Sequence, residues 1–119
     1  MFNFERLEVW QQAIEFADLV YKNTMSFPGD ERFGLTNQMR RAAVSISSNL
    51  DEGSSRNSRK DFARFIEIAV GSVFEVVSQS FIARNQGFLS QEQFQQHYQA
   101  AEKQGKMLSG LRRSLLEDS

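Results

Sequence analysis

Three short clusters of turn-forming residues divide the chain into four long segments, which limits the folds open to it. The clusters lie at residues 26–30, 52–58 and 85–87 and concentrate the glycine, proline, serine and asparagine that interrupt regular structure. Within each segment, apolar residues recur at i, i+3, i+4 and i+7, as they do along one stripe of an α-helix. None of the segments shows the sustained two-residue alternation that predicts a strand. The expected helices cover approximately residues 5–25, 36–53, 58–86 and 90–116.

Signals at the segment ends support these helices. Ser90 and Gln93 have the spacing of a capping box, in which each side chain bonds to the other residue's backbone. Ser58 is placed to cap the third helix in a weaker version of the same arrangement. Gly53 and Gly87 stand where glycine most easily ends a helix in the left-handed conformation.

Helices of this length joined by short connections run antiparallel to their neighbours. The chain has 119 residues and a mass of 13.7 kDa, which suits one compact domain. The sequence therefore predicts an all-α fold, an up-down-up-down antiparallel four-helix bundle that forms a single domain over residues 1–119.

Two of the predicted helices carry more apolar residues than a bundle core requires. The predicted core stripe of the first helix consists of Leu7, Trp10, Ile14, Ala17 and Tyr21. A second apolar row beside it consists of Val9, Ala13, Phe16 and Val20. On the third helix, the second row consists of Ala63, Val70, Phe74, Val77 and Phe81. Such rows either widen an irregular core or form a contact between subunits. We favour a contact between subunits. The candidate residues for it are Val9, Phe16, Phe74 and Phe81.

A polar face on the second and third helices is a further interface candidate. Gly71 in mid-helix costs about 1 kcal/mol relative to alanine, which close approach of another group would justify. An antiparallel hairpin brings Arg41 to the level of Gly71, with Glu67 and Glu75 one turn to either side. We therefore hypothesise that Arg41 lies over Gly71 and pairs with one or both glutamates, within or between subunits. The alternative is an ordinary surface ion-pair ladder; Ser45 lies on the same face.

Nucleic-acid binding is a candidate function because basic residues concentrate between positions 36 and 64, although the net charge of the whole chain is −1. Repeated around a ring, such residues would form a basic rim able to hold phosphates. The alternative is a solvated turn whose charges cap the helices. The candidate residues are Arg40, Arg56, Arg59, Lys60 and Arg64.

Composition argues against several other functions. The chain has no cysteine and one histidine, so thiolate sites and histidine-built metal centres or triads are not expected. His97 is expected to be a partly buried helix residue rather than a ligand. No glycine-rich phosphate loop, signal peptide or membrane-spanning segment is expected. We therefore expect a cytoplasmic protein that has no catalytic residues, metal or cofactor and does not contact a membrane.

Several blocks resemble a known bacterial family of four-helix bundles, named for proteins encoded in intervening sequences of 23S rRNA genes. The resemblance lies in residues 7–13, in 27–46 with its Arg-Arg-Ala-Ala-x-Ser-Ile block, in the Asn-Leu-Asp-Glu-Gly block at 49–53, and in 69–72. It implies a homopentameric ring with no assigned catalytic activity. The family is also similar to the accessory protein of diversity-generating retroelements, a basic pentameric barrel that binds nucleic acid and a reverse transcriptase. The chain departs from the family at Asp51, where alanine is usual, and in its slightly acidic charge.

The expected function is therefore a non-catalytic homo-oligomeric scaffold or accessory protein, a pentameric ring that binds RNA or DNA through its repeated basic residues. The alternative is a ring-shaped adaptor that binds a protein partner and no nucleic acid.

Overall fold

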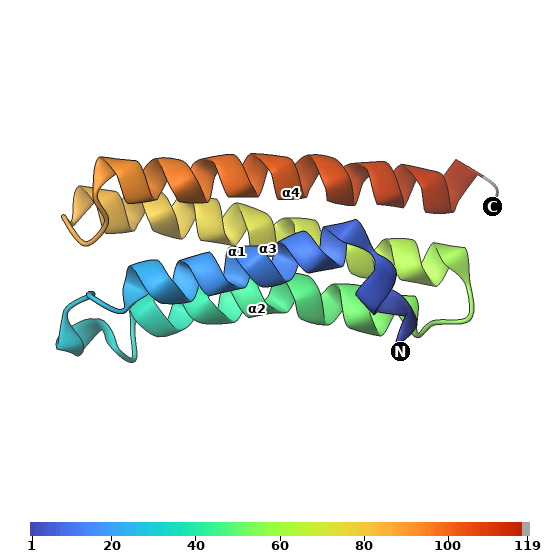
Figure 1. The fold of residues 1–119 in the computed structure, drawn as a ribbon, viewed down its shortest axis with the longest axis horizontal. Helices are drawn as coiled ribbons and strands as arrows, with labels where there is room; N and C mark the ends of the chain where they lie inside the picture. Colours follow the sequence, from blue (N-terminus) through green and yellow to red (C-terminus); the bar gives the residue numbers. More distant parts are fainter. Residues whose placement is uncertain (118–119) are drawn as a thin grey trace.

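The computed structural model describes residues 1–117 and confirms an all-α fold in which the helices run alternately up and down (Figure 1). A short 3-10 turn, η1, precedes the first helix, and another, η2, lies in the first connection; they span Asn3–Arg6 and Gly29–Glu31. The helices are α1 (Glu8–Thr24), α2 (Leu35–Ser54), α3 (Arg59–Asn85) and α4 (Gln91–Glu117).

The helices form a closed square in the order of the chain. Helix α1 packs against α2 and α4, and α3 packs against the same two helices. The α1–α2 pair therefore presents one outer face and the α3–α4 pair presents the opposite one, as the two layers in Figure 1 show. The bundle measures 46 × 22 × 21 Å.

The predicted signals at two helix starts and one helix end are confirmed. The Ser58 hydroxyl accepts a hydrogen bond from the Asp61 backbone N–H at 3.0 Å and caps α3. Ser90 and Gln93 form the reciprocal capping box of α4, with both bonds at 3.0 Å. Gly87 has a φ of 79° and occupies the left-handed region after α3.

The prediction for Gly53 is wrong, and the structure gives a different reason for the glycine. Gly53 lies inside α2 rather than in a left-handed turn after it. A Cβ atom added here would meet the Phe62 ring at 2.7 Å and the Phe65 Cβ at 2.9 Å. The glycine therefore allows the start of α3 to pack closely against the end of α2.

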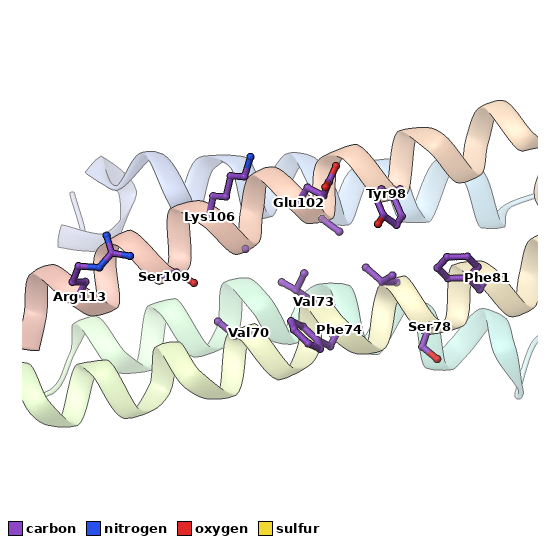
Figure 2. Close-up of a pocket in the computed structure, with 13 residues that line it drawn as sticks. Val70, Val73, Phe74, Ser78, Phe81, Tyr98, Glu102, Lys106, Ser109 and Arg113 are labelled. Carbon is purple, nitrogen blue, oxygen red and sulfur yellow. The ribbon is translucent and has the colours of Figure 1, made fainter.

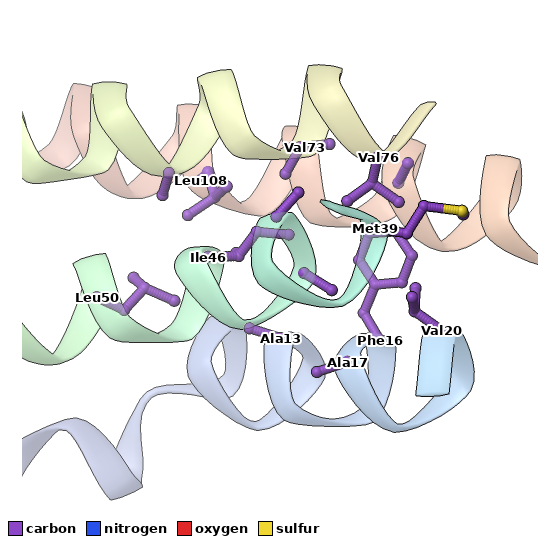
Figure 3. Close-up of a cluster of buried hydrophobic side chains, with 14 of the residues drawn as sticks. Ala13, Phe16, Ala17, Val20, Met39, Ile46, Leu50, Val73, Val76 and Leu108 are labelled. Atoms are coloured by element: carbon purple, nitrogen blue, oxygen red, sulfur yellow. The ribbon is translucent and has the colours of Figure 1, made fainter. Parts of the chain in front are cut away.

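The core contains apolar side chains from all four helices (Figure 3). Met39, Ile46 and Leu50 of α2 are fully buried and belong to one apolar cluster with Val76 of α3 and Leu108 of α4. The core continues along the length of the bundle without a break.

The orientation predicted for α1 is wrong. Val9 and Phe16 lie in the core and not on an outer second row, so they are buried within the subunit and offer no surface for another. Ile14 and Tyr21, predicted to be in the core, are exposed instead. Both rows are apolar, and burial favours the one that leaves the Tyr21 hydroxyl and the neighbouring Asp18 carboxylate in water.

Within residues 1–117, α3 is the one helix with a length and composition that would allow it to cross a membrane. Of its most apolar window, 39% is buried inside the bundle. Helix α3 is apolar both on the side that faces the core and on part of the side that faces outward.

Candidate functional site

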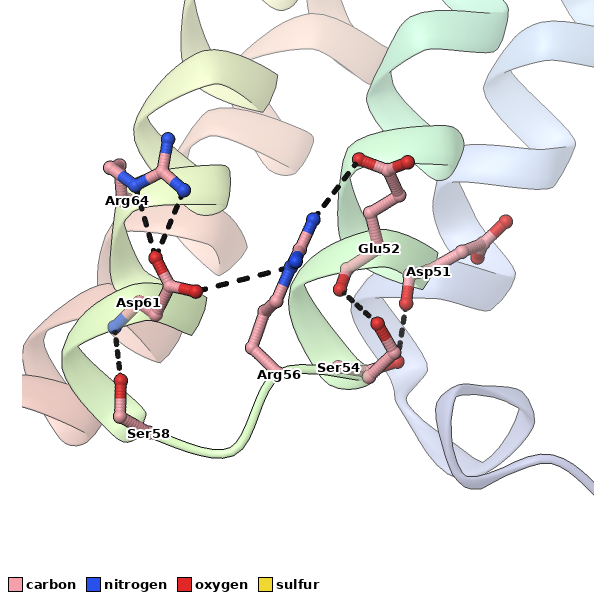
Figure 4. A network of polar contacts seen from close by, with 8 residues as sticks. Asp51, Glu52, Ser54, Arg56, Ser58, Asp61 and Arg64 are labelled. Atoms are coloured by element: carbon pink, nitrogen blue, oxygen red, sulfur yellow. Dashed lines mark hydrogen bonds and ion pairs between the residues drawn. The ribbon is translucent and has the colours of Figure 1, made fainter.

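Two of the basic residues at the α2–α3 turn, Arg56 and Arg64, are paired with carboxylates (Figure 4). The Arg56 guanidinium lies 3.9 Å from both Glu52 and Asp61, and Arg64 is 3.0 Å from Asp61. Both guanidinium groups also stack on the Phe65 ring, at 4.7 and 4.8 Å from its centre. These pairs favour the interpretation of the cluster as a charge-compensated turn.

Arg59 binds within the subunit. Its guanidinium donates hydrogen bonds to the backbone carbonyls of Ser114 at 2.7 Å and Leu115 at 3.2 Å. A cation at a helix C-terminus satisfies carbonyls that lack helical partners and interacts favourably with the helix dipole. Arg59 therefore fastens the start of α3 to the end of α4. Lys60 is exposed and has no ion pair with the residues that the structure describes.

Arg40 does not belong to this cluster, so the five basic candidates do not form one patch. It donates a hydrogen bond to the Thr24 hydroxyl at 2.9 Å and stacks on the Tyr21 ring at 4.6 Å. Thr24 ends α1, near the opposite end of the bundle from the α2–α3 turn. The four remaining candidates share one end of the molecule.

The contact predicted between Arg41 and Gly71 does not form within the subunit. Glu67 pairs with Arg112 of α4 at 2.8 Å instead, and the space beside Gly71 is open. Arg41 and Glu75 are both exposed, and neither has an ion pair with another described residue. A contact of Arg41 with Gly71 and the glutamates of a second subunit stays a prediction.

Ser45, another interface candidate, is half-buried at the seam between α2 and α3. Its hydroxyl accepts a hydrogen bond from the Ser72 hydroxyl at 2.9 Å and also accepts one from the Asn49 amide at 3.1 Å. Ser45 thus contributes to packing between two helices of one subunit.

A groove of about 960 Å³ lies between α3 and α4. Its α3 wall is mainly apolar, whereas its α4 wall carries Glu102, Lys106 and Arg113 (Figure 2). Phe74 is 71% exposed and Phe81 39% exposed, in contrast to Val9 and Phe16. The α3 wall consists of Val70, Val73, Phe74, Val77, Ser78 and Phe81.

An aromatic cluster closes one end of the groove. Phe81 lies edge-on to Phe94, with ring centres 4.7 Å apart, and both rings approach Tyr98. The Arg84 guanidinium stacks over Phe94 at 4.3 Å and over Phe81 at 5.1 Å. These contacts hold Phe81 in place, so the groove has a firm wall at that end.

His97 is buried in a polar network that sequence reasoning did not find. Its Nε2 lies 3.0 Å from the Asn23 amide nitrogen, and its Nδ1 lies 3.0 Å from the Ser80 hydroxyl. Burial lowers the pKa of His97 to about 4. The imidazole is therefore neutral and has no access to solvent. In the described part of the chain, no group of three or more His, Cys, Asp or Glu side chains is placed to hold a metal ion.

Fold and surface together define the class of protein, an antiparallel four-helix bundle with an open, mainly apolar groove between α3 and α4. A family model described as 23S rRNA-intervening sequence protein matches residues 5–110, and the chain belongs to this family.

Comparison with solved structures supports the fold. A protein of unknown function from the S23 ribosomal protein family of Bacteroides thetaiotaomicron superposes with a TM-score of 0.78 at 22% sequence identity. The match covers 88% of this chain and 98% of the other. No curated protein matches the chain.

Proposed function

We propose that the protein is a non-catalytic, cytoplasmic scaffold that works as a homo-oligomeric ring assembled through the α3–α4 groove. The observation that carries this proposal is Phe74, an aromatic side chain 71% exposed on the wall of an apolar groove. Contiguous exposed apolar surface of this kind marks interaction sites. The family resemblance described above supports five as the number of subunits.

The absence of a catalytic role is part of the same proposal. The single imidazole of the chain is buried between α1, α3 and α4, where no substrate reaches it. The groove combines apolar side chains with a few charges on one rim, an arrangement that suits association better than bond-breaking chemistry.

Molar mass in solution tests the assembly. The wild-type protein is expected at about 68 kDa, five times the 13.7 kDa of one chain, in light scattering coupled to size exclusion. Phe74→Glu places a charge in the groove and is expected to reduce the mass to that of one chain. Phe33→Glu is the matched control, because Phe33 is 87% exposed in the first connection and outside the groove. A wild-type protein that stays monomeric at micromolar concentration would overturn the proposal.

RNA or DNA binding is a second, narrower proposal. Its support is Lys60, an exposed cation at the start of α3 that has no ion pair with residues 1–117. A ring would repeat this cation around one rim, where the copies would bind phosphates without reading sequence.

An electrophoretic shift series tests this second proposal. Single-stranded RNA and duplex DNA are expected to shift at low salt and to be released as salt rises. Lys60→Glu is expected to lose the shift, whereas Lys22→Glu, on α1, retains it. If neither nucleic acid shifts at low salt, the proposal fails and the alternative of an adaptor ring for a protein partner is favoured.

A further inference from the structure

The buried His97 lies behind the aromatic end of the α3–α4 groove. Ser80, whose hydroxyl bonds to the imidazole, adjoins Phe81 on α3, and His97 itself adjoins Tyr98 on α4. Phe81 and Tyr98 line the groove from opposite walls, with their ring centres 6.3 Å apart (Figure 2). The same turns of α3 and α4 therefore carry the buried polar network and part of the surface through which the protein is proposed to assemble.

Both ring nitrogens of His97 are bonded to uncharged side chains. The Asn23 amide nitrogen donates to Nε2, and the proton on Nδ1 bonds to the Ser80 hydroxyl. A proton added at Nε2 would place two donors against each other inside the bundle. The imidazole is 1% exposed, so water does not solvate the added charge while the network is closed.

Charged side chains from the surrounding helices do not compensate a positive imidazole. Those that face this part of the bundle come from all four helices; they are Glu15 of α1, Arg40 of α2, Arg84 of α3 and Lys103 of α4. Three of the four are cations, and none of the four bonds to His97. Glu15, the one acid, is exposed at the α1–α4 seam, where its charge is screened. A charge on His97 therefore has no partner in the closed network.

A neighbouring subunit in the groove would make the network harder to open. Phe81 and Tyr98 are 39% and 37% exposed in the free subunit, so at the groove the turns that hold the network border on water. A subunit seated on these two rings would fix them, together with Ser80 and His97 beside them in the chain. Local opening then requires less free energy in the free subunit than in the assembled one.

We infer that acid weakens the self-assembly of this protein by charging the imidazole behind the groove. This inference rests on the proposed assembly through the groove and specifies how that assembly is regulated. Burial lowers the pKa of His97 to about 4, against 6.5 ordinarily, so an opened network takes up a proton first as the pH falls. Because coupling between two binding events is reciprocal, a proton that opposes assembly is itself opposed by assembly.

Dissociation of the wild-type protein and of His97→Gln at pH 7 and pH 5 tests the inference. Light scattering across a dilution series gives the concentration at which half of the assembly has dissociated. For the wild-type protein, this midpoint is expected to rise by up to about twentyfold at pH 5, the limit in which an opened network has the ordinary pKa of histidine. Gln keeps a donor and an acceptor but takes up no proton, so the midpoint of His97→Gln is expected to change by less than about twofold. Circular dichroism checks that both proteins stay helical at pH 5.

Reciprocity gives a second readout that does not depend on a substitution in the network. The chain has one histidine, so NMR follows the titration of a single imidazole. The pKa of His97 is expected to be higher by up to about one unit in Phe74→Glu, the monomeric variant, than in the assembled wild-type protein. Phe33→Glu, outside the groove, is expected to match the wild-type protein.

Two results would refute this regulation while leaving the proposed assembly intact. One is a dissociation midpoint that is the same at pH 7 and pH 5, or that changes equally in the wild-type protein and in His97→Gln. The other is an equal pKa of His97 in the assembled protein and in monomeric Phe74→Glu. A wild-type protein that is already monomeric at pH 7 defeats the proposed function instead, so the two failures are distinguishable.

Discussion

The buried histidine shows how one residue couples the stability of this bundle to pH. The Asn23 amide nitrogen can only donate, so Nε2 of His97 accepts and the ring proton lies on Nδ1, where it donates to Ser80. The Ser80 hydroxyl in turn donates to the Val76 carbonyl at 2.7 Å. The network satisfies every partner only while the imidazole is neutral.

Stability is therefore expected to fall as the pH decreases through the region where the unfolded chain takes up a proton at His97. The pKa is about 4 in the fold against 6.5 ordinarily, so the unfolded state binds the proton first. The loss begins near pH 6.5, is complete near pH 4, and amounts to about 3 kcal/mol.

Urea unfolding of the wild-type protein and of His97→Gln, compared at each pH, measures this loss. The difference in the free energy of unfolding between the two proteins cancels contributions from the carboxylates. It should shrink from pH 7 to pH 4. A difference that does not change with pH would show that His97 has the same pKa in the folded and unfolded states, which would contradict this prediction.

Replacing glycine by alanine is expected to change the stability of the fold in opposite directions at Gly53 and at Gly110. Gly53→Ala forces a methyl group against Phe62 and Phe65 and is expected to destabilise the fold by about 1 to 3 kcal/mol. Gly110→Ala, on α4 with open space around it, is expected to stabilise the fold by up to about 1 kcal/mol. Thermal and urea unfolding measure both, and equal effects of the two changes would contradict the packing described for Gly53.

At the scale of single elements, capping fixes where the last helix begins. The Ser90 hydroxyl accepts from the Gln93 N–H, and Ser90→Ala is expected to lower the free energy of unfolding by about 1 kcal/mol. Ser114→Ala, a change of the same size at an exposed site late in α4, is expected to have little effect. Hydrogen exchange of the first turn of α4 measures the local loss, which should be confined to the Ser90 variant.

Local signals in the sequence predict that the helices exist, but they do not predict which face of α1 is turned toward the core. Periodicity, the capping box and Gly87 are properties of neighbouring residues, so the sequence predicts them correctly. The two apolar rows of α1 are nearly equivalent by themselves, and the choice between them depends on α2 and α4. Sequence reasoning therefore misassigned Val9 and Phe16 as surface residues, and Ile14 and Tyr21 as core.

The sequence also predicts part of the two candidate surfaces, the apolar groove and the basic turn between α2 and α3. Phe74 and Phe81 are exposed, as their place in the second apolar row of the third helix predicts, whereas Ala63 of the same row is buried. The pairing of Arg64 with Asp61 is an i, i+3 contact that the sequence signals, and it weakens the basic patch. The bonds from Arg59 to the end of α4 join residues more than fifty positions apart, and no local pattern indicates them.

At the scale of the whole molecule, assembly should appear in the thermal stability. Association removes folded monomer from the unfolding equilibrium, so the melting temperature of the wild-type protein is expected to rise with protein concentration. Phe74→Glu should melt at one temperature over the same range, whereas Phe33→Glu should behave like wild type. Differential scanning calorimetry at several concentrations measures this, and identical concentration dependence in all three proteins would exclude a role for the groove.

Helix α3, apolar toward both the core and the groove, also has a consequence for synthesis. The ribosome completes α3 before α4 exists, so the growing chain carries its most apolar segment while one of that segment's two partner helices is still missing. How quickly codons 86–117 are translated then sets how long this segment stays available to chaperones and to other nascent chains. Synonymous codons that slow this stretch should lower the soluble yield without changing a single amino acid.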